Sequence, residues 1–233
     1  MNIEQLILDF SKKENIEKEK ILGIDFNCVN NGIAYSNADG TIKGIIYRYS
    51  DNEEERMRIY RNIKKNKKKR SRYISLKRKR SLKNNPLYKI NIFTSNRYRN
   101  CLANVQKQAL KESRFKKQDS ERIANKIYAL CKDCGFATIR LENLNLAAMQ
   151  KFNGSMIEQN NWGQLKECLL KKQTDTIKVS VAPAFEKSTH VCSACGKERE
   201  VKLKLRNRIF TCPACGYKEN RDLNAARNIA QNG

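Results

Sequence analysis

Two Cys-x-x-Cys pairs near the C-terminus constrain the fold more than any other feature. Cys192 and Cys195 form the first pair, Cys212 and Cys215 form the second, and a glycine follows each pair. Four thiols at this spacing are typical of a tetrahedral zinc site. The alternative is two disulfides, but the chain has nine cysteines, an odd number, and no recognisable secretory signal. We therefore expect one structural zinc ion held by all four thiols.

Three other potential ligands have explanations that need no metal. Cys131 and Cys134 form a further pair, but the Gly135 that follows is typical of a helix end, and no partner pair remains to complete a site. The only histidine, His190, lies beside the first zinc pair, where four cysteines leave no vacant position. We expect none of the three to bind zinc.

The charge of the chain indicates an anionic partner. Its 233 residues include 48 Lys and Arg against 24 Asp and Glu, which gives a net charge of +24. Tyr and Phe residues that could stack on bases favour nucleic acid over a membrane surface. No apolar run is long enough to span a bilayer, and Met1 to Phe10 lack the basic start of a targeting sequence. We therefore expect a cytoplasmic protein that binds nucleic acid.

Short apolar segments predict a β-sheet that begins with three antiparallel strands joined by Asn- and Gly-rich connections. The predicted strands span residues 21–27, 32–36, 41–49, 136–141 and 176–181. A helix is expected at 160–172, between the last two strands, and another at 223–230.

A long basic insertion, residues 51–132, separates the third strand from the fourth. Apolar residues recur in it at roughly helical spacing, which predicts helices at 51–83 and 95–131, with an interruption near 115–119 left open. The density of positive charge in the first helix favours contacts with phosphates over a merely solvated face. The residues expected to make these contacts are Lys64, Lys65, Lys67, Lys68, Lys69, Arg70, Arg72, Lys77, Arg78, Lys79 and Arg80.

Three acidic residues occupy distinctive places in this pattern. Asp25 lies on the first predicted strand, Glu142 at the end of the fourth, and Asp222 at the head of the last helix. Two of them have a structural alternative. Asp25 could be a partly exposed strand-end residue paired with a lysine, and Asp222 could be the N-cap of its helix.

The order of the elements predicts that these acids converge. Three antiparallel strands, a helical crossover and a parallel fourth strand are the layout of an RNase H-like mixed α/β sheet, in which the first and fourth strands are neighbours. Asp25 and Glu142 would then face one cleft, with Asp222 delivered by the last helix. Convergent carboxylates repel one another unless cations lie between them, and their hard oxygens suit two Mg²⁺ or Mn²⁺ ions. Two such ions would support hydrolysis of a phosphodiester.

The chain also resembles a known family in four motifs. These are Gly23-Ile24-Asp25, Leu141-Glu142-Asn143-Leu144-Asn145, the four-cysteine ribbon and Arg221 to Ile229. They are similar to the RuvC domain and inserted zinc ribbon of TnpB, the transposon-encoded RNA-guided nuclease, and of the type V CRISPR effectors akin to it. The resemblance implies that Asp25, Glu142 and Asp222 are the catalytic magnesium ligands of a two-metal DNA endonuclease.

The resemblance also implies a domain organisation. Residues 1–20 would be an N-terminal arm, 21–186 and 217–233 a RuvC-like domain into which the basic helices 51–132 are inserted, and 187–216 the zinc ribbon. DNA and a guide RNA are the implied partners. Family members carry a large N-terminal recognition region, whereas only residues 1–20 precede the first strand here. An RNA or a separate partner protein would then supply that recognition.

Two other functions compete with a nuclease. A compact TnpB derivative could bind RNA or DNA as a subunit or regulator without cutting it. A zinc-dependent transcription factor would explain the ribbon but would leave Asp25 and Glu142 unexplained.

Overall fold

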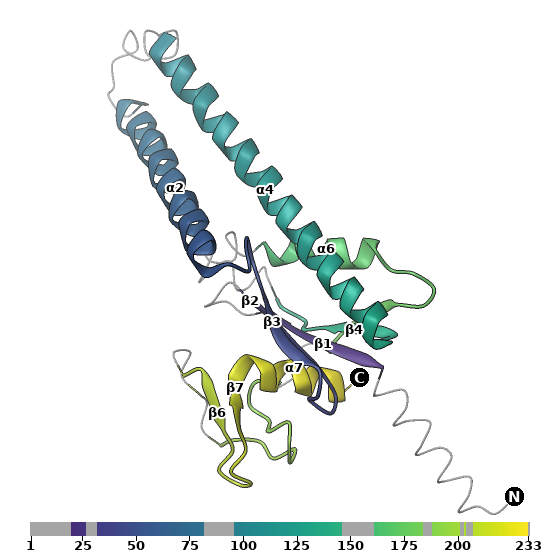
Figure 1. Ribbon diagram of the computed structural model, residues 1–233. Helices are drawn as coiled ribbons and strands as arrows, with labels where there is room; N and C mark the ends of the chain where they lie inside the picture. Colours follow the sequence, from purple (N-terminus) through teal and green to yellow (C-terminus); the bar gives the residue numbers. More distant parts are fainter. Residues whose placement is uncertain are drawn as a thin grey trace, which may run out of the picture. The chain divides into compact units, whose positions relative to one another are not determined.

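The computed structural model describes residues 20–26, 32–81, 96–145, 161–183, 188–200, 203 and 207–232. They form two compact units (Figure 1). The helical unit comprises Tyr49–Asp119, and the sheet unit comprises the described residues before Tyr49 and after Asp119. Of the expected arm at 1–20 only Lys20 is described, and the expected end of the first basic helix at residue 83 lies outside the described residues. No helix in the described part of the chain is long and apolar enough to cross a membrane.

A mixed five-stranded sheet forms the centre of the sheet unit, with the order β3-β2-β1-β4-β5. The first three strands pair in antiparallel fashion, whereas β4 runs parallel to both β1 and β5. The strands are β1 (Ile21–Phe26), β2 (Gly32–Asn37), β3 (Lys43–Tyr47), β4 (Thr138–Leu141) and β5 (Lys178–Val181). The prediction of a mixed α/β fold is confirmed, as is the parallel pairing of the first strand with the strand after the crossover.

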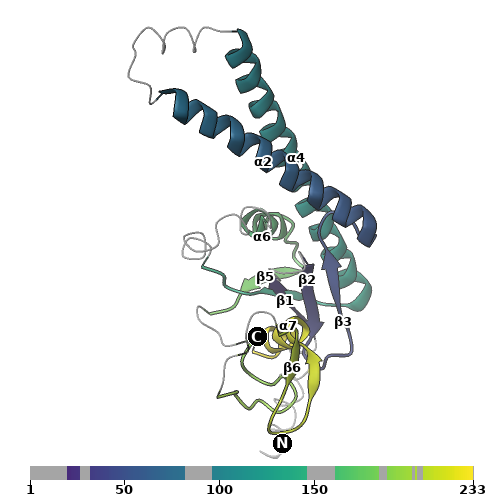
Figure 2. The ribbon, with the colours of Figure 1, turned by 90° about the vertical axis from the view of Figure 1, so that its left-hand side faces the viewer.

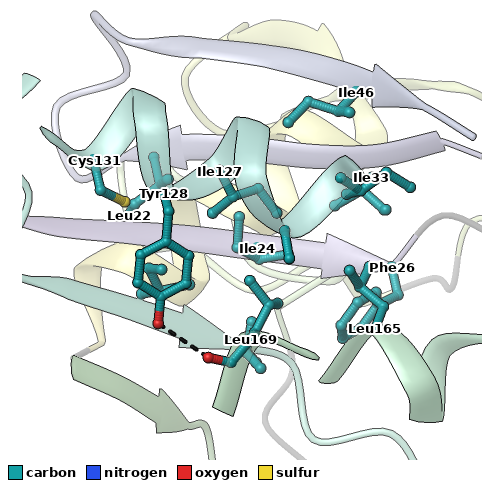
Figure 3. Close-up of a cluster of buried hydrophobic side chains, with 14 of the residues drawn as sticks. Leu22, Ile24, Phe26, Ile33, Ile46, Ile127, Tyr128, Cys131, Leu165 and Leu169 are labelled. Atoms are coloured by element: carbon teal, nitrogen blue, oxygen red, sulfur yellow. Dashed lines mark hydrogen bonds between the residues drawn. The ribbon is translucent and has the colours of Figure 1, made fainter. Parts of the chain in front are cut away.

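The two faces of β1 carry different kinds of residue, because successive side chains of a strand point to opposite sides. Leu22, Ile24 and Phe26 are buried in the main hydrophobic core. The last turns of α4 (Asn96–Cys134) and the helix α6 (Trp162–Lys171) complete this core (Figure 3). The residues that the helices contribute include Ile123, Ile127, Tyr128, Trp162, Leu165 and Leu169, and the hydroxyl of Tyr128 donates a hydrogen bond of 3.0 Å to the Leu169 carbonyl.

The helix α7 (Arg221–Gln231) packs against the other side of the sheet, opposite α6 (Figure 2). Its backbone lies directly on β1. A methyl group at Gly23 would approach the carbonyl oxygen of Ala226 to 2.1 Å and the amide nitrogen of Ala230 to 2.6 Å. No side chain larger than hydrogen fits at Gly23, so this glycine lets α7 approach the strand that carries Asp25.

The helical unit contains α2 (Glu53–Ser81) and the first part of α4. At its base the backbone amide of Tyr49 donates a hydrogen bond of 2.8 Å to Asp119, and the Tyr49 ring stacks on Phe115 with 5.6 Å between ring centroids. An ion pair of 2.7 Å joins Lys116 to Glu112 one turn earlier. These contacts stabilise the helix at 115–119, so the interruption left open there does not occur.

The end of α4 follows the expectation for Gly135. This glycine has φ of 74°, and the amide of Phe136 donates a 2.9 Å hydrogen bond to the carbonyl of Cys131. The positive φ and this hydrogen bond form a Schellman motif, which ends the helix. Cys131 and Cys134 therefore belong to a helix terminus and not to a zinc knuckle.

A second sheet, of two antiparallel strands, belongs to the ribbon. It comprises β6 (Ile209–Thr211) and β7 (Lys218–Asn220). Phe210 is fully buried and clusters with Cys192 and Cys212. The ribbon therefore has a small apolar centre beside its cysteines.

Candidate active site

The four ribbon cysteines form a cluster that could hold a metal ion such as zinc. Their sulfur atoms all lie within 4.8 Å of one another. The sulfurs of Cys192 and Cys215 are 3.7 Å apart, as are those of Cys195 and Cys212. A tetrahedral zinc ion with Zn–S bonds of about 2.3 Å requires sulfur–sulfur separations of about 3.8 Å, whereas a disulfide would bring the sulfurs to about 2.05 Å. The geometry therefore fits one tetrahedral ion and excludes the disulfide alternative.

The two knuckles have the same backbone geometry. Gly196 has φ of 71° and Gly216 has φ of 73°, a region that favours glycine. The amide of Gly196 donates a 2.8 Å hydrogen bond to the Cys192 carbonyl, and the amide of Gly216 donates a 3.0 Å bond to the Cys212 carbonyl. Each glycine thus closes the turn that presents two thiols to the ion.

No other group of Cys, His, Asp or Glu in the described ranges is as tight as this one. Cys131 lies in the main core, where burial and the neighbouring Cys134 raise the pKa of its thiol to about 12. A thiol that holds its proton so strongly is a poor metal ligand at neutral pH. His190 is close to the ribbon but is not part of the cluster.

Asp25 and Glu142 come from adjacent parallel strands and lie on the α7 side of the sheet. Asp25 is 5% exposed on β1, on the face opposite Leu22 and Ile24. Glu142 directly follows β4, and its amide extends the ladder by donating a 3.1 Å hydrogen bond to the carbonyl of Ile24. The alternative that Asp25 is a partly exposed strand-end residue is therefore wrong.

Asp222 lies in the first turn of α7 and is 5% exposed. The side-chain oxygen of Asn220 accepts hydrogen bonds from the amides of Asp222, at 2.9 Å, and Leu223, at 3.4 Å. Asn220 is therefore the N-cap, and the alternative that Asp222 caps this helix is wrong. The carboxylate of Asp222 therefore does not act as the cap of α7.

The three acids share one electrostatic environment. The pKa of Asp25 is raised well above its ordinary value, first by burial, then by the negative charges of Glu142 and Asp222 and by a hydrogen bond with Glu142. Burial also raises the pKa of Asp222, against the opposing effect of Arg208 and Arg221. An ionised Asp25 is therefore unfavourable in this site unless a cation accompanies it.

Arg208, which directly precedes β6, contacts Asp222. Its Nη1 lies 3.2 Å from each carboxylate oxygen. The carbonyl of Arg208 also accepts a 2.8 Å hydrogen bond from the amide of Arg221. The segment between the two cysteine pairs thus contributes a positive charge to the acidic site, and sequence reasoning did not identify Arg208 in this role.

Side-chain amides on α7 bind the backbone of the first cysteine knuckle, at Val191 and Ser193. Asn224 accepts a 3.0 Å hydrogen bond from the amide of Ser193 and donates a 2.8 Å bond to the Val191 carbonyl. Asn228 donates a 2.7 Å bond to Val191, and Gln231 donates a 3.0 Å bond to Ser193. Sequence reasoning missed these roles, although two asparagines four residues apart are unfavourable in a helix unless their side chains bind something.

A second connection joins the ribbon to the edge of the large sheet. Lys43 on β3 forms an ion pair with Glu219 on β7. Arg227 of α7 donates a 3.1 Å hydrogen bond to the carbonyl of Ala38, in the turn that joins β2 to β3. These contacts connect β3 to β7, and α7 to the turn between β2 and β3.

Part of this chain is similar to Cas12f1 proteins. Residues 162–229 match the model of the Cas12f1-like TNB domain. The chain is 29% identical over 122 residues to the CRISPR-associated endodeoxyribonuclease Cas12f1 of Sulfoacidibacillus thermotolerans, across 52% of this chain and 28% of that protein. These matches support the resemblance to TnpB and Cas12f effectors that the sequence motifs indicated. The segment that matches the Cas12f1-like TNB domain contains all four ribbon cysteines, Arg208 and Asp222.

Solved Cas12f structures share the fold. A CRISPR-Cas12f ternary complex superimposes with a TM-score of 0.57 and 23% identity, over 90% of this chain and 38% of that chain. A Cas12f1-sgRNA-target DNA complex gives a TM-score of 0.58 and 21% identity, over 90% of this chain and 49% of that one. The chain thus spans less than half the length of each of these three Cas12f proteins.

The basic residues expected to contact phosphates lie on α2, and this segment is helical as predicted. The structure describes the side chains of Lys64, Lys65, Lys68 and Arg72, all of which are exposed. The side chains of Lys67, Lys69, Arg70, Lys77, Arg78, Lys79 and Arg80 lie outside those that the structure describes.

Proposed function

We propose that this chain is a metal-dependent DNA endonuclease of the RuvC type, with an RNase H-like sheet at its centre. The observation that carries the proposal is that the buried Asp25 of β1 shares a hydrogen bond with Glu142, which follows β4, and lies in the electrostatic field of the buried Asp222 of α7. The strand order and directions support it, because they are those expected of an RNase H-like sheet. The relation to an endodeoxyribonuclease adds support from outside the chain.

The donor set fits two divalent cations such as Mg²⁺ or Mn²⁺. All three side chains offer hard carboxylate oxygens, and the repulsion among them would be relieved by bound cations. Bound in this way, the ions would activate a water molecule and stabilise the leaving oxygen of a phosphodiester. Asp25 and Glu142 would hold them from the sheet, and Asp222 from the first turn of α7. Burial of the two aspartates would restrict access of bulk water to the ligand atoms.

We propose DNA as the substrate and a guide RNA as a partner. The exposed Lys64, Lys65, Lys68 and Arg72 on α2 would bind phosphates, and the net charge of +24 would favour association with either nucleic acid. Support for RNA guidance comes from a Cas12f1 relative solved in complex with sgRNA and target DNA. The ribbon cysteines would hold one structural zinc ion.

A nuclease assay tests this proposal. Labelled single- and double-stranded DNA would be incubated with the protein and Mg²⁺ or Mn²⁺, with and without RNA copurified from the expressing cells. We expect metal-dependent cleavage that Asp25→Ala abolishes. Cleavage that is equally fast in Asp25→Ala would show that these acids are not the active site, and cleavage without RNA would remove the guide from the proposal.

One observation favours a second candidate, a nucleic-acid-binding subunit that does not cut. Arg208 already contacts both carboxylate oxygens of Asp222, where a nuclease would place a cation. The same assay separates the two functions. Tight, salt-sensitive binding without cleavage under any metal condition would favour the binding subunit.

A further inference from the structure

We propose that Arg208 is an internal counter-ion that competes with divalent cations for Asp222. The inference rests on the proposed function, in which Asp222 is a metal ligand. It adds that the zinc ribbon, through Arg208, sets the metal concentration at which the acidic site fills.

The position of the guanidinium carries this inference. Nη1 of Arg208 lies 3.2 Å from both oxygens of Asp222, so it occupies the space between them in which a cation bridged by the carboxylate would lie. Asp222 is 5% exposed, which leaves few other directions of approach. The amide of Arg221 donates a 2.8 Å hydrogen bond to the carbonyl of Arg208, which fixes the backbone from which this side chain extends.

The ion pair between Arg208 and Asp222 has a geometry that a competing cation could displace. The strongest arginine–carboxylate pairs use two nitrogens on two oxygens, whereas here one nitrogen serves both oxygens. The Nε of Arg208 is buried and has no hydrogen-bond partner among the described residues. The side chain as a whole is 26% exposed, so it has a route toward solvent. A cation that binds Asp222 would displace a guanidinium that is only partly satisfied where it lies.

The charges around the site explain why such a counter-ion is useful. Asp25 lies in the electrostatic field of both Glu142 and Asp222, and the positive charges of Arg208 and Arg221 act on Asp222. Without a cation, Arg208 offsets the cost of burying the negative charge of Asp222 in the first turn of α7. A bound cation would neutralise Asp222 in place of the guanidinium, so Arg208 would no longer be needed there and would be released.

A titration of the zinc-loaded full chain with Mn²⁺ tests the competition between Arg208 and the cation. The electron paramagnetic resonance signal of free Mn²⁺ measures how much of the ion is bound. Arg208→Gln removes the counter-ion, and we expect it to bind Mn²⁺ roughly three- to tenfold more tightly than the wild type. Lys218→Gln is the matched control, because Lys218 is an exposed residue of β7 and its loss changes the net charge equally. We expect that control to stay within about twofold of the wild type.

Unchanged or weaker Mn²⁺ binding by Arg208→Gln would overturn the inference, since a residue that merely positions Asp222 would weaken binding when removed. Asp25→Asn separates this failure from that of the proposed function. If Asp25→Asn leaves Mn²⁺ binding intact, the acids are not the metal site. If Asp25→Asn weakens binding while Arg208→Gln does not strengthen it, only the counter-ion role is wrong.

A second measurement covers the case in which Arg208→Gln does not fold, as judged by its zinc content and circular dichroism. A structure of the wild-type protein with Mn²⁺ should show the ion on Asp222 and the Arg208 guanidinium turned away from it. An ion on Asp222 with the Arg208 contact intact would overturn the inference.

Discussion

Asn224 accepts a hydrogen bond from the backbone amide of Ser193 over 3.0 Å, and its amide group donates to the carbonyl of Val191 over 2.8 Å. This side chain lies two residues after Asp222 on the same helix, while Ser193 lies between Cys192 and Cys195, the two cysteines of the first knuckle. Folding of the first knuckle and the position of Asp222 are therefore linked, because Asn224 contacts the knuckle and belongs to the helix that carries Asp222.

Asn224→Ala tests this link. The substitution leaves the buried amide of Ser193 without its acceptor, so we expect a loss of about 2 kcal/mol in the free energy of unfolding, measured by urea denaturation. Asn125→Ala is the control, because Asn125 is exposed on α4 and its loss should change stability by less than about 0.5 kcal/mol. Equal effects of the two variants would contradict a special role for Asn224.

Removal of zinc should affect the acidic site as well as the ribbon. Metal binding and folding are coupled in small zinc domains, and the hydrogen bonds of Asn224, Asn228 and Gln231 carry that coupling into α7. We expect a chelator, or Cys212→Ser, to speed hydrogen exchange in the first turn of α7 as well as in the ribbon. Exchange that changes in the ribbon alone would show that the helix is independent of it.

Gly23→Ala should be among the most destabilising single substitutions in the chain. The added methyl would meet the Ala226 carbonyl at 2.1 Å and the Ala230 amide at 2.6 Å, both backbone atoms that cannot turn aside. We expect a loss of about 3 kcal/mol. The control, Gly163→Ala, places the same methyl at an exposed position of α6, where it should be neutral or stabilise by about 0.5–1 kcal/mol. A well-folded Gly23→Ala protein would mean that α7 does not lie directly on β1.

Asp25→Asn should stabilise the metal-free protein. The raised pKa of Asp25 means that the folded state keeps a proton that the unfolded state loses above about pH 4. Stability therefore falls as pH rises from there through the folded-state pKa. At pH 7 we expect Asp25→Asn to raise the melting temperature by a few degrees and to remove this fall.

Asp39→Asn makes the same chemical change and should have the opposite effect. Hydrogen bonds from Thr41 hold the pKa of Asp39 below its ordinary value, so the stabilisation from its charge is present above the unfolded-state pKa and is lost as pH falls. Removal of the charge of Asp39 should therefore lower the melting temperature slightly at pH 7. Melting temperatures that shift in the same direction for both variants would contradict the electrostatic environment described for Asp25.

The parts of the fold that depend on local periodicity were accessible from the sequence. Alternation along β1 places Ile24 in the core and Asp25 on the opposite face, and Gly135 ends its helix as expected. The N-cap was not identified from the sequence, because aspartate is a good capping residue and Asp222 was weighed for that role, whereas the structure has Asn220 as the cap and Asp222 in the first turn. Only the hydrogen bonds to Asn220 decide between them.

Contacts between distant segments could not be predicted. The interruption considered at residues 115–119 does not occur, because Phe115 stacks on Tyr49, which lies far away in the sequence. Arg208 carries no local signal that distinguishes it from the other arginines of the ribbon, and only the folded chain brings it to Asp222. Such residues become visible only when the pairing of the elements is known.

The measurement that tests the central claim most directly is Mn²⁺-supported cleavage of labelled DNA by the conservative variants Asp25→Asn, Glu142→Gln and Asp222→Asn, beside Asp39→Asn. If the three acids hold the catalytic cations, each of the first three variants should lose at least about 100-fold in rate, which corresponds to roughly 2.7 kcal/mol of transition-state stabilisation. Asp39→Asn should cleave at the wild-type rate. Cleavage by Asp25→Asn or Asp222→Asn within a few fold of the wild type would contradict the account.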